Sequence, residues 1–179
     1  MEMNNGKKPS SKQETNKLYD YIFLCFFMGN DFLPHFPSMN IRTNGIQIML
    51  EAYKYINKDE KRNLTDGKKI YWKNVRKLIK FLGENEHSNL LNEYKIRGKW
   101  EKRSFPSKTE EDKKNRYMCI PIKNRDLEKY IDPYKSFWEK RYYEMLFNNT
   151  DSNYFKKQVS LNYMEGLEWV MNYYTSGCL

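Results

Sequence analysis

The segment FFMGNDFLPH, from Phe26 to His35, holds the residues whose types and spacing are best suited to chemistry. Asp31 follows Gly29 and Asn30 at the end of a long apolar block, and glycine lets the backbone turn sharply at such a point. A carboxylate placed there projects into a cleft and can serve as an oxygen ligand for a hard cation such as Mg²⁺. The alternative is a structural aspartate that caps the end of a helix or strand.

Other side chains near this segment have weaker claims to a site. Asp20, eleven residues before Asp31, either reaches the same cation or, as we favour, is structural. His35 follows a proline and is more often structural in that setting, so we do not assign it to the site. The second histidine and the three cysteines are widely spaced, and no zinc site or disulfide framework is indicated.

The composition is that of a basic chain that folds. Its 179 residues include 32 Lys plus Arg against 23 Asp plus Glu, which gives a net charge of +9, and 16% are aromatic, which is high for a disordered chain. This length suits one domain or parts of two and excludes a multidomain enzyme complete in the chain. We find no membrane span and no secretory signal, and expect an intracellular protein, cytoplasmic or alternatively nuclear.

Apolar periodicity predicts a mainly α-helical fold after a polar tail. Residues 1–17 have no large apolar residue after Met3 and are expected to be flexible. The block 18–29 is predicted to be a buried element, followed by a loop that Pro34 and Pro37 stiffen.

The later helices are predicted from i, i+3, i+4 spacing and from their end signals. Thr43 or Asn44 can cap the first, Asp132-Pro133 starts the third, and Gly177 stops the last. The predicted helices span 44–57, 72–82 with a continuation toward 94, 132–148, and 156–174.

Basic residues are frequent, and we interpret most of them as solvated. Residues 95–125 hold eleven Lys or Arg against four acidic residues and are predicted to form a basic surface insertion. Lys140 and Arg141 lie on the aromatic helix predicted over 132–148 and are candidates for contact with phosphates.

Four segments, in this order along the chain, resemble the XRN family of 5′→3′ exoribonucleases. They are DYIFLCFFMGNDFLPHFPSM (20–39), NIRTNGIQIMLEAYK (40–54), FWEKRYYEMLF (137–147) and NYMEGLEWVMNYYTSGC (162–178). The resemblance covers about residues 18–179, with 58–69 and 95–125 poorly matched.

The resemblance implies a fold and an activity. Residues 44–179 would form the family's helical domain, and 18–43 the last piece of an α/β nuclease domain of the PIN or flap-endonuclease type. Such enzymes processively degrade 5′-monophosphorylated, single-stranded RNA with carboxylates clustered around Mg²⁺, and Asp31 matches the last carboxylate of that cluster. A tryptophan of the family's helical region stacks on the RNA bases, and Trp169 is the best match for it.

The position of Trp169 on the last predicted helix agrees with such a role. It lies roughly 160° from Leu167 on a helical wheel, away from the stripe that carries Tyr163 and Val170. An aromatic residue on that face can receive a base. The alternative, with equal weight, is a core tryptophan in a helix that is apolar nearly all round.

The catalytic carboxylates that the family places before Asp31 have no counterpart in this chain. Two-metal hydrolysis needs ions roughly 3.5–4 Å apart held by several carboxylates, which one aspartate cannot provide. We therefore expect a chain that is inactive alone, contributes Asp31 and part of the RNA channel, and takes the other carboxylates from a separate or upstream polypeptide. The alternatives are a non-catalytic helical module that binds nucleic acid or protein, and a structural fragment without activity.

Overall fold

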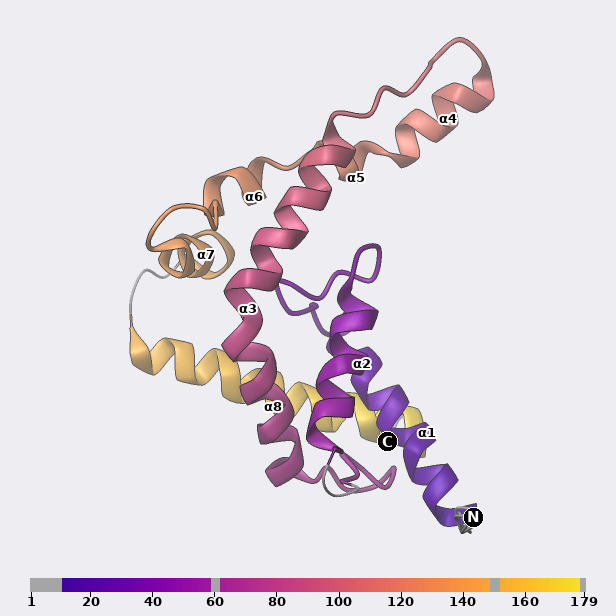
Figure 1. The fold of residues 1–179 in the computed structure, drawn as a ribbon, viewed down its shortest axis with the longest axis vertical. Coiled ribbons are helices and arrows are strands. Elements are labelled where there is room, and N and C mark those ends of the chain that lie inside the picture. The colour runs from indigo at the N-terminus through magenta and orange to yellow at the C-terminus, as the bar shows by residue number, and fades with distance from the viewer. Residues whose placement is uncertain (1–10, 59–61, 149–151, 178–179) are drawn as a thin grey trace, which may run out of the picture. The chain divides into compact units, whose positions relative to one another are not determined.

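The computed structural model describes residues 11–58, 62–148 and 152–177, and these are mostly helical (Figure 1). Within the described residues there is no strand, and Thr65 and Ile70 form an isolated antiparallel bridge. The predicted mainly α fold is confirmed. The helices are α1 (Ser11–Phe26), α2 (Gly45–Ile56), α3 (Trp72–Glu101), α4 (Glu110–Met118), α5 (Ile120–Lys123), α6 (Asp126–Ile131), α7 (Trp138–Phe147) and α8 (Asn153–Ser176).

The chain divides into two compact units. The first comprises residues 1–84 and 161–179, and the second comprises residues 85–160. The division falls within α3 and α8, so each of these long helices contributes to both units. Residues 18–43 hold most of α1 and the loop after it and contain no strand, and their assignment to a nuclease domain stays a prediction.

Four helices build the core of the first unit. In Figure 1, α8 runs across α1, α2 and the first turns of α3, and buried side chains from all four form one apolar cluster. Burying a large apolar side chain contributes about 1.5–3 kcal/mol, so this cluster is the main source of the unit's stability. Its fully buried members include Phe23, Phe27, Met49, Ala52, Val75, Leu78, Leu167 and Val170.

The helix bounds confirm much of what the periodicity predicts. Helix α2 lies within the predicted 44–57, and α3 continues past 94 to Glu101. Asn44 is the N-cap of α2 but its side chain makes no capping hydrogen bond; the Asn40 carbonyl instead accepts the backbone N–H groups of Thr43 and Gly45, each at 3.1 Å. Helix α8 ends just before Gly177, as predicted.

Helix α1 begins within the segment that we predicted to be a flexible polar tail, residues 1–17. Helix α1 begins at Ser11, so residues 11–17 are helical. They add polar turns to the N-terminal end of the apolar part of the helix. A helix that a buried face has started can continue into polar sequence, and the predicted flexibility of 11–17 stays a prediction. Residues 1–10 lie outside the described part of the chain.

The helix predicted over 132–148 starts later than expected. Helix α7 begins at Trp138, while Asp132, the predicted N-cap, is the C-cap of α6 with a φ of +42°. Phe137 also has a positive φ, +62°, so a turn separates the two helices. The predicted end is correct, because Asn148 is the C-cap of α7.

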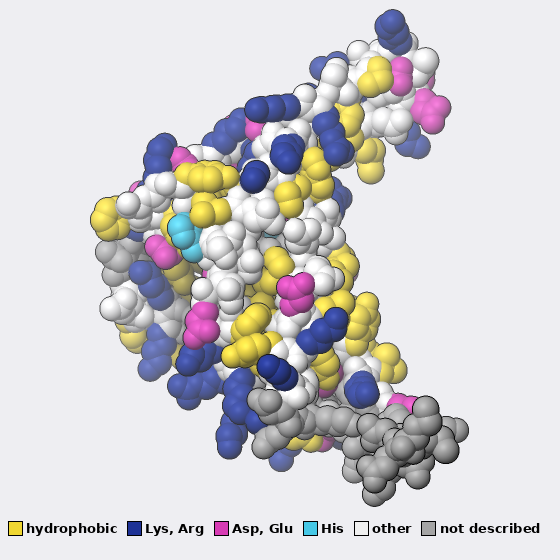
Figure 2. All heavy atoms as spheres, in the orientation of Figure 1, with side chains coloured by type: hydrophobic (Ala, Val, Ile, Leu, Met, Phe, Trp, Pro, Cys, Tyr) yellow, Lys and Arg dark blue, Asp and Glu magenta, His cyan; other side chains and the backbone are white. Residues whose placement is uncertain are grey.

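The basic segment 95–125 lies mostly at the surface of the second unit. Helices α4 and α5 have no buried residue, and several basic side chains lie over α3 and α5 on the face in Figure 2. Arg125 is the exception, with 6% of its side chain exposed. Its guanidinium donates to Glu128 at 2.5 Å and to Glu101 at 3.2 Å, and lies over the Tyr94 ring.

Candidate nucleic-acid interface

The turn that carries Asp31 is fixed by Gly29 and Asn30. Gly29 has a φ of +88°, a left-handed conformation that favours glycine, and this allows the chain to reverse directly after α1. The Asn30 side-chain oxygen accepts the backbone N–H groups of Phe32 and Leu33, each at 2.8 Å. The predicted sharp turn is therefore present, and the asparagine closes it in the manner of an Asx turn.

The same loop is anchored on α8. The Tyr163 hydroxyl donates to the carbonyl of Pro34 at 3.1 Å. A Cβ built on Gly166 would lie 2.6 Å from a methyl carbon of Leu33, so a larger residue there would push the Leu33 side chain aside. The loop after α1 and the middle of α8, which are distant in sequence, thus form one surface.

Three aromatic rings meet on this surface. Trp169 stacks on Tyr173 with ring centroids 5.4 Å apart and an interplanar angle of 14°. Phe32 approaches both rings edge-on, at 4.9 Å from Trp169 and 5.2 Å from Tyr173. We call Phe32, Trp169 and Tyr173 the aromatic cluster. Trp169 is 50% exposed and Phe32 is 45% exposed, so the cluster is accessible and Trp169 is not a core residue.

Asp31 directly precedes the exposed ring of Phe32 and is itself exposed. Within the described residues, no group of three or more His, Cys, Asp or Glu side chains could hold a metal ion. In the described part of the chain Asp31 is thus not grouped with other possible metal ligands, and a lone exposed carboxylate cannot compete with water for Mg²⁺. The predicted role of Asp31 as one ligand of a larger centre stays a prediction.

Asp20 has a structural role. Its side chain is fully buried and accepts three hydrogen bonds, from the Tyr53 hydroxyl at 2.6 Å and from the backbone N–H groups of Leu64 at 2.7 Å and Thr65 at 2.9 Å. Burial raises the pKa of the Asp20 carboxyl, while these hydrogen bonds oppose the rise. Asp20 thereby joins α1 to α2 and to the segment before α3, as we favoured from the sequence.

Arg141 and Lys140 lie in the second unit and differ in their surroundings. The Arg141 guanidinium donates to the backbone carbonyls of residues 130, 131, 132, 135 and 136, at 2.8–3.2 Å. These bonds hold the turn between α6 and α7, and a phosphate would have to displace them. Lys140 is exposed. The predicted RNA contacts of both residues stay predictions.

The arrangement supports stacking of flat groups beside a carboxylate. Exposed aromatic rings bind nucleobases of any sequence, each stacked base contributing about 1–3 kcal/mol. Our sequence reasoning missed Phe32 and Tyr173. Tyr173 lies four residues after Trp169, so helical i, i+4 spacing is a signal that could have found it, whereas only the tertiary fold brings Phe32 to them.

The chain matches a protein family whose model describes a helical domain. Residues 12–130 and 133–179 match the family model described as Xrn1 helical domain. The chain therefore belongs to the XRN family of exoribonucleases. The matched residues include 18–43, which we had predicted to end the nuclease domain, and that boundary stays a prediction.

Similar proteins carry names that agree with this family. The 5′-3′ exoribonuclease 2 homolog of Drosophila melanogaster is 29% identical over 204 residues, which cover 90% of this chain and 22% of the relative. The 5′-3′ exoribonuclease 2 of Gallus gallus is 26% identical, with 89% of this chain and 24% of the relative covered. That of Arabidopsis thaliana is 41% identical over 80 residues, 44% of this chain and 8% of the relative. The chain thus spans under a quarter of the length of these relatives.

Proposed function

We propose that this chain forms one wall of the RNA channel of a 5′→3′ exoribonuclease that degrades 5′-monophosphorylated RNA. The observation that carries the proposal is the aromatic cluster. In it the half-exposed Trp169 contacts Phe32, and Phe32 directly follows Asp31. In this proposal the bases of a single strand stack on the cluster while the scissile phosphate is held near Asp31.

The chemistry of such a centre limits what this chain does alone. Phosphodiester hydrolysis by two Mg²⁺ ions requires several carboxylates to hold the ions and offset their charge. Asp31 supplies one, and the others come from nuclease residues outside this chain. The isolated chain is therefore expected to bind RNA without cutting it.

A non-catalytic role is the second candidate. The observation that favours it is that the described residues include no group of three or more His, Cys, Asp or Glu side chains that could hold a metal ion. In that role the aromatic cluster still binds single-stranded RNA, but Asp31 carries no chemistry.

Reconstitution distinguishes the two. The chain is mixed with a polypeptide that supplies the nuclease residues of an XRN relative, and the loss of a 5′-monophosphorylated RNA is followed in the presence of Mg²⁺. We expect digestion by the mixture, none by either polypeptide alone, and none when Asp31→Ala replaces the wild type. An inert mixture that still binds RNA, or an Asp31→Ala chain that restores full digestion, contradicts the catalytic proposal.

A further inference from the structure

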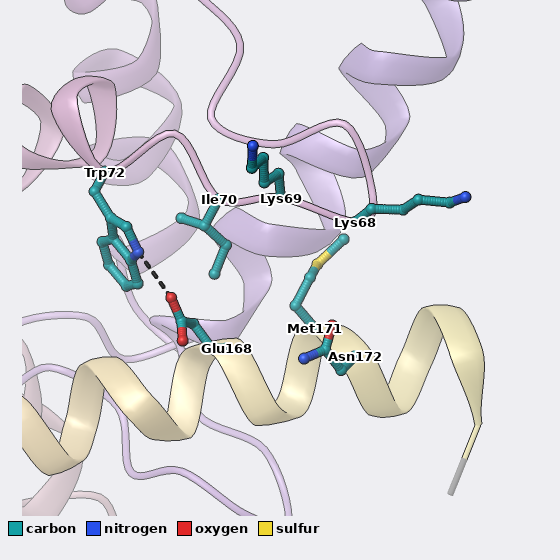
Figure 3. Close-up of a pocket in the computed structure, with 7 residues that line it drawn as sticks. All are labelled: Lys68, Lys69, Ile70, Trp72, Glu168, Met171 and Asn172. Atoms are coloured by element: carbon teal, nitrogen blue, oxygen red, sulfur yellow. Dashed lines mark hydrogen bonds between the residues drawn. The ribbon is translucent and has the colours of Figure 1, made fainter. Parts of the chain in front are cut away.

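A second candidate site, a cavity, lies on another face of α8. A cavity of about 320 Å³ lies between the segment before α3 and one face of α8, all within the first unit (Figure 3). This volume is in the range of small-molecule sites. It is lined by Lys68, Lys69, Ile70, Trp72, Glu168, Met171 and Asn172.

The segment on one side of the cavity is held in place by Asp66. One Asp66 carboxylate oxygen accepts the backbone N–H groups of Lys68 at 3.0 Å and Lys69 at 2.8 Å. The other oxygen accepts the Tyr71 hydroxyl at 2.9 Å. These bonds fix the backbone that presents both lysines, so a ligand does not have to order it, and binding loses less entropy.

The same segment is also anchored from the core. Gly67 has a φ of +89°, and a Cβ there would lie 2.7 Å from the ring of Tyr19 in α1. The preceding residues Leu64 and Thr65 bind the buried Asp20 carboxylate through their backbone N–H groups. Contacts with Tyr19 and Asp20 of α1 therefore hold this wall of the cavity in place.

The α8 side presents groups with defined hydrogen-bonding capacity. The Trp72 indole N–H donates to one oxygen of Glu168 at 2.9 Å, the bond drawn in Figure 3. This bond orients the carboxylate, whose second oxygen can accept from a ligand. Asn172, one turn further along α8, can both donate and accept, while Ile70 supplies apolar surface and Met171, which is buried, lies behind it.

The charge of the lining favours an anionic ligand. Two lysines stand against one carboxylate, and lysine ammonium groups are common phosphate ligands. In Figure 3 the Lys69 side chain points away from α8 and the Lys68 side chain points to the side, and both are exposed, so they are able to turn over the opening when a ligand arrives.

We propose that this cavity binds a phosphorylated nucleotide. The phosphate binds Lys68 and Lys69, and the base lies against Ile70 and the Trp72 indole. The base edge exchanges hydrogen bonds with Glu168 and Asn172. Two sources supply such a group, a free mononucleotide or one nucleotide of an RNA strand.

The proposal is independent of the aromatic cluster. Glu168 and Asn172 line the cavity, whereas Trp169 and Tyr173, each one residue further along α8, belong to the cluster. Successive residues of a helix point about 100° apart, so the two sites use different faces. Either site can fail its test while the other passes.

The test follows the backbone amide signals of the ¹⁵N-labelled chain by NMR during titration. The probes are adenosine 5′-monophosphate, adenosine, inorganic phosphate and a 5′-phosphorylated oligoadenylate. We expect the mononucleotide or the oligonucleotide to shift signals of residues 68–72 and 168–172 at concentrations where adenosine and phosphate have little effect. Comparable affinity for mononucleotide and oligonucleotide assigns the site to a free nucleotide, and much tighter binding of the oligonucleotide assigns it to an RNA strand.

Charge reversal supplies the matched comparison. The double variant Lys68→Glu/Lys69→Glu should weaken binding at these residues by about tenfold or more, since phosphate contacts are charge-assisted. The control Lys54→Glu/Lys77→Glu makes the same change in net charge at two exposed lysines that do not line the cavity, and should change the affinity little. Amide spectra of both variants check that they fold.

Four outcomes overturn the proposal. Neither phosphorylated probe shifts the cavity signals; adenosine shifts them as strongly as its monophosphate; inorganic phosphate alone does so; or the cavity and control variants lose affinity equally. Should Lys68→Glu/Lys69→Glu fail to fold, Asn172→Ala takes its place with the same expected direction, and unchanged affinity then contradicts the proposal.

Discussion

Phe32 lies edge-on to Trp169, with ring centroids 4.9 Å apart and ring planes at 73°. Phe32 belongs to the loop after α1 and Trp169 to α8, so this contact joins two segments that are remote in the sequence. Because Asp31 immediately precedes Phe32, the carboxylate and the stacking rings share one surface of the first unit. A strand bound on the rings would therefore run beside the carboxylate.

Replacing Trp169 with alanine should weaken the binding of single-stranded RNA. Loss of one stacked base costs about 1–3 kcal/mol of binding free energy. Stability should fall by no more than about 3 kcal/mol, the upper value for the two aromatic pairs that Trp169 forms with Phe32 and Tyr173. Fluorescence anisotropy with a labelled RNA and urea unfolding measure the two quantities.

The control for this change is Tyr154→Ala, at an exposed tyrosine near the start of the same helix. It should leave RNA affinity unchanged. If Trp169→Ala lowers stability by several kcal/mol while affinity per folded molecule is retained, Trp169 is a packing residue and the proposed stacking role is wrong.

Replacement by alanine should lower the free energy of unfolding much more at Asp20 than at Asp31. Asp20→Ala leaves the Tyr53 hydroxyl and two buried backbone N–H groups without their acceptor, which should cost about 3 kcal/mol or more. Asp31→Ala, at an exposed side chain, should change the free energy of unfolding by about 0.5 kcal/mol or less. Equal losses in urea unfolding would show that Asp20 does not hold the first unit together.

Asp66 should make stability depend on acidic pH. Hydrogen bonds from the Lys69 and Lys68 backbone and the Tyr71 hydroxyl lower the pKa of its carboxyl in the folded chain. A carboxyl whose pKa is lower in the folded than in the unfolded chain stabilises the fold at pH values above its unfolded pKa, about 3.9. That contribution is lost as the pH falls through the folded pKa. The stability difference between wild type and Asp66→Asn should therefore shrink from pH 6 to pH 2.5. A difference that stays constant or grows contradicts the assignment.

Arg141 should act on stability more than on RNA. A lysine at this position keeps the charge but cannot reach five carbonyls, so Arg141→Lys should destabilise the turn between α6 and α7 by about 2 kcal/mol. Lys140→Gln, at the exposed neighbour, should leave stability within about 0.5 kcal/mol. Thermal unfolding measures the stability of each variant, and fluorescence anisotropy measures its affinity for RNA. If Arg141→Lys lowers RNA affinity while stability is unchanged, Arg141 contacts RNA and the structural assignment is wrong.

The positions of most long helices followed from the sequence because amphipathic periodicity reflects burial directly. The start of α7 did not, since the turn from Asp132 to Phe137 is held by Arg141, whose guanidinium donates to backbone carbonyls of residues 130–136. Local signals, an aspartate followed by a proline, favoured a helix start there. The hydrogen bonds of the Arg141 guanidinium outweighed these local signals.

The candidate site was predictable in part. Helical geometry placed Trp169 off the buried stripe, and its exposure agrees. The partner ring Phe32 and the cavity beside Trp72 depend on which elements pack together, and a single sequence carries no such information. The same holds for Asp20, whose three donors come from residues more than thirty positions away.

The most direct test of the central claim observes the Trp169 indole during RNA binding. The chain has four tryptophans, so a sample labelled with ¹⁵N-tryptophan gives four indole signals, assigned by single Trp→Phe variants. On titration with a 5′-monophosphorylated single-stranded RNA, we expect the Trp169 signal to shift or broaden and that of Trp138, in the second unit, to stay in place. An unmoved Trp169 signal when anisotropy shows the chain saturated with RNA would contradict the claim that the aromatic cluster receives the RNA.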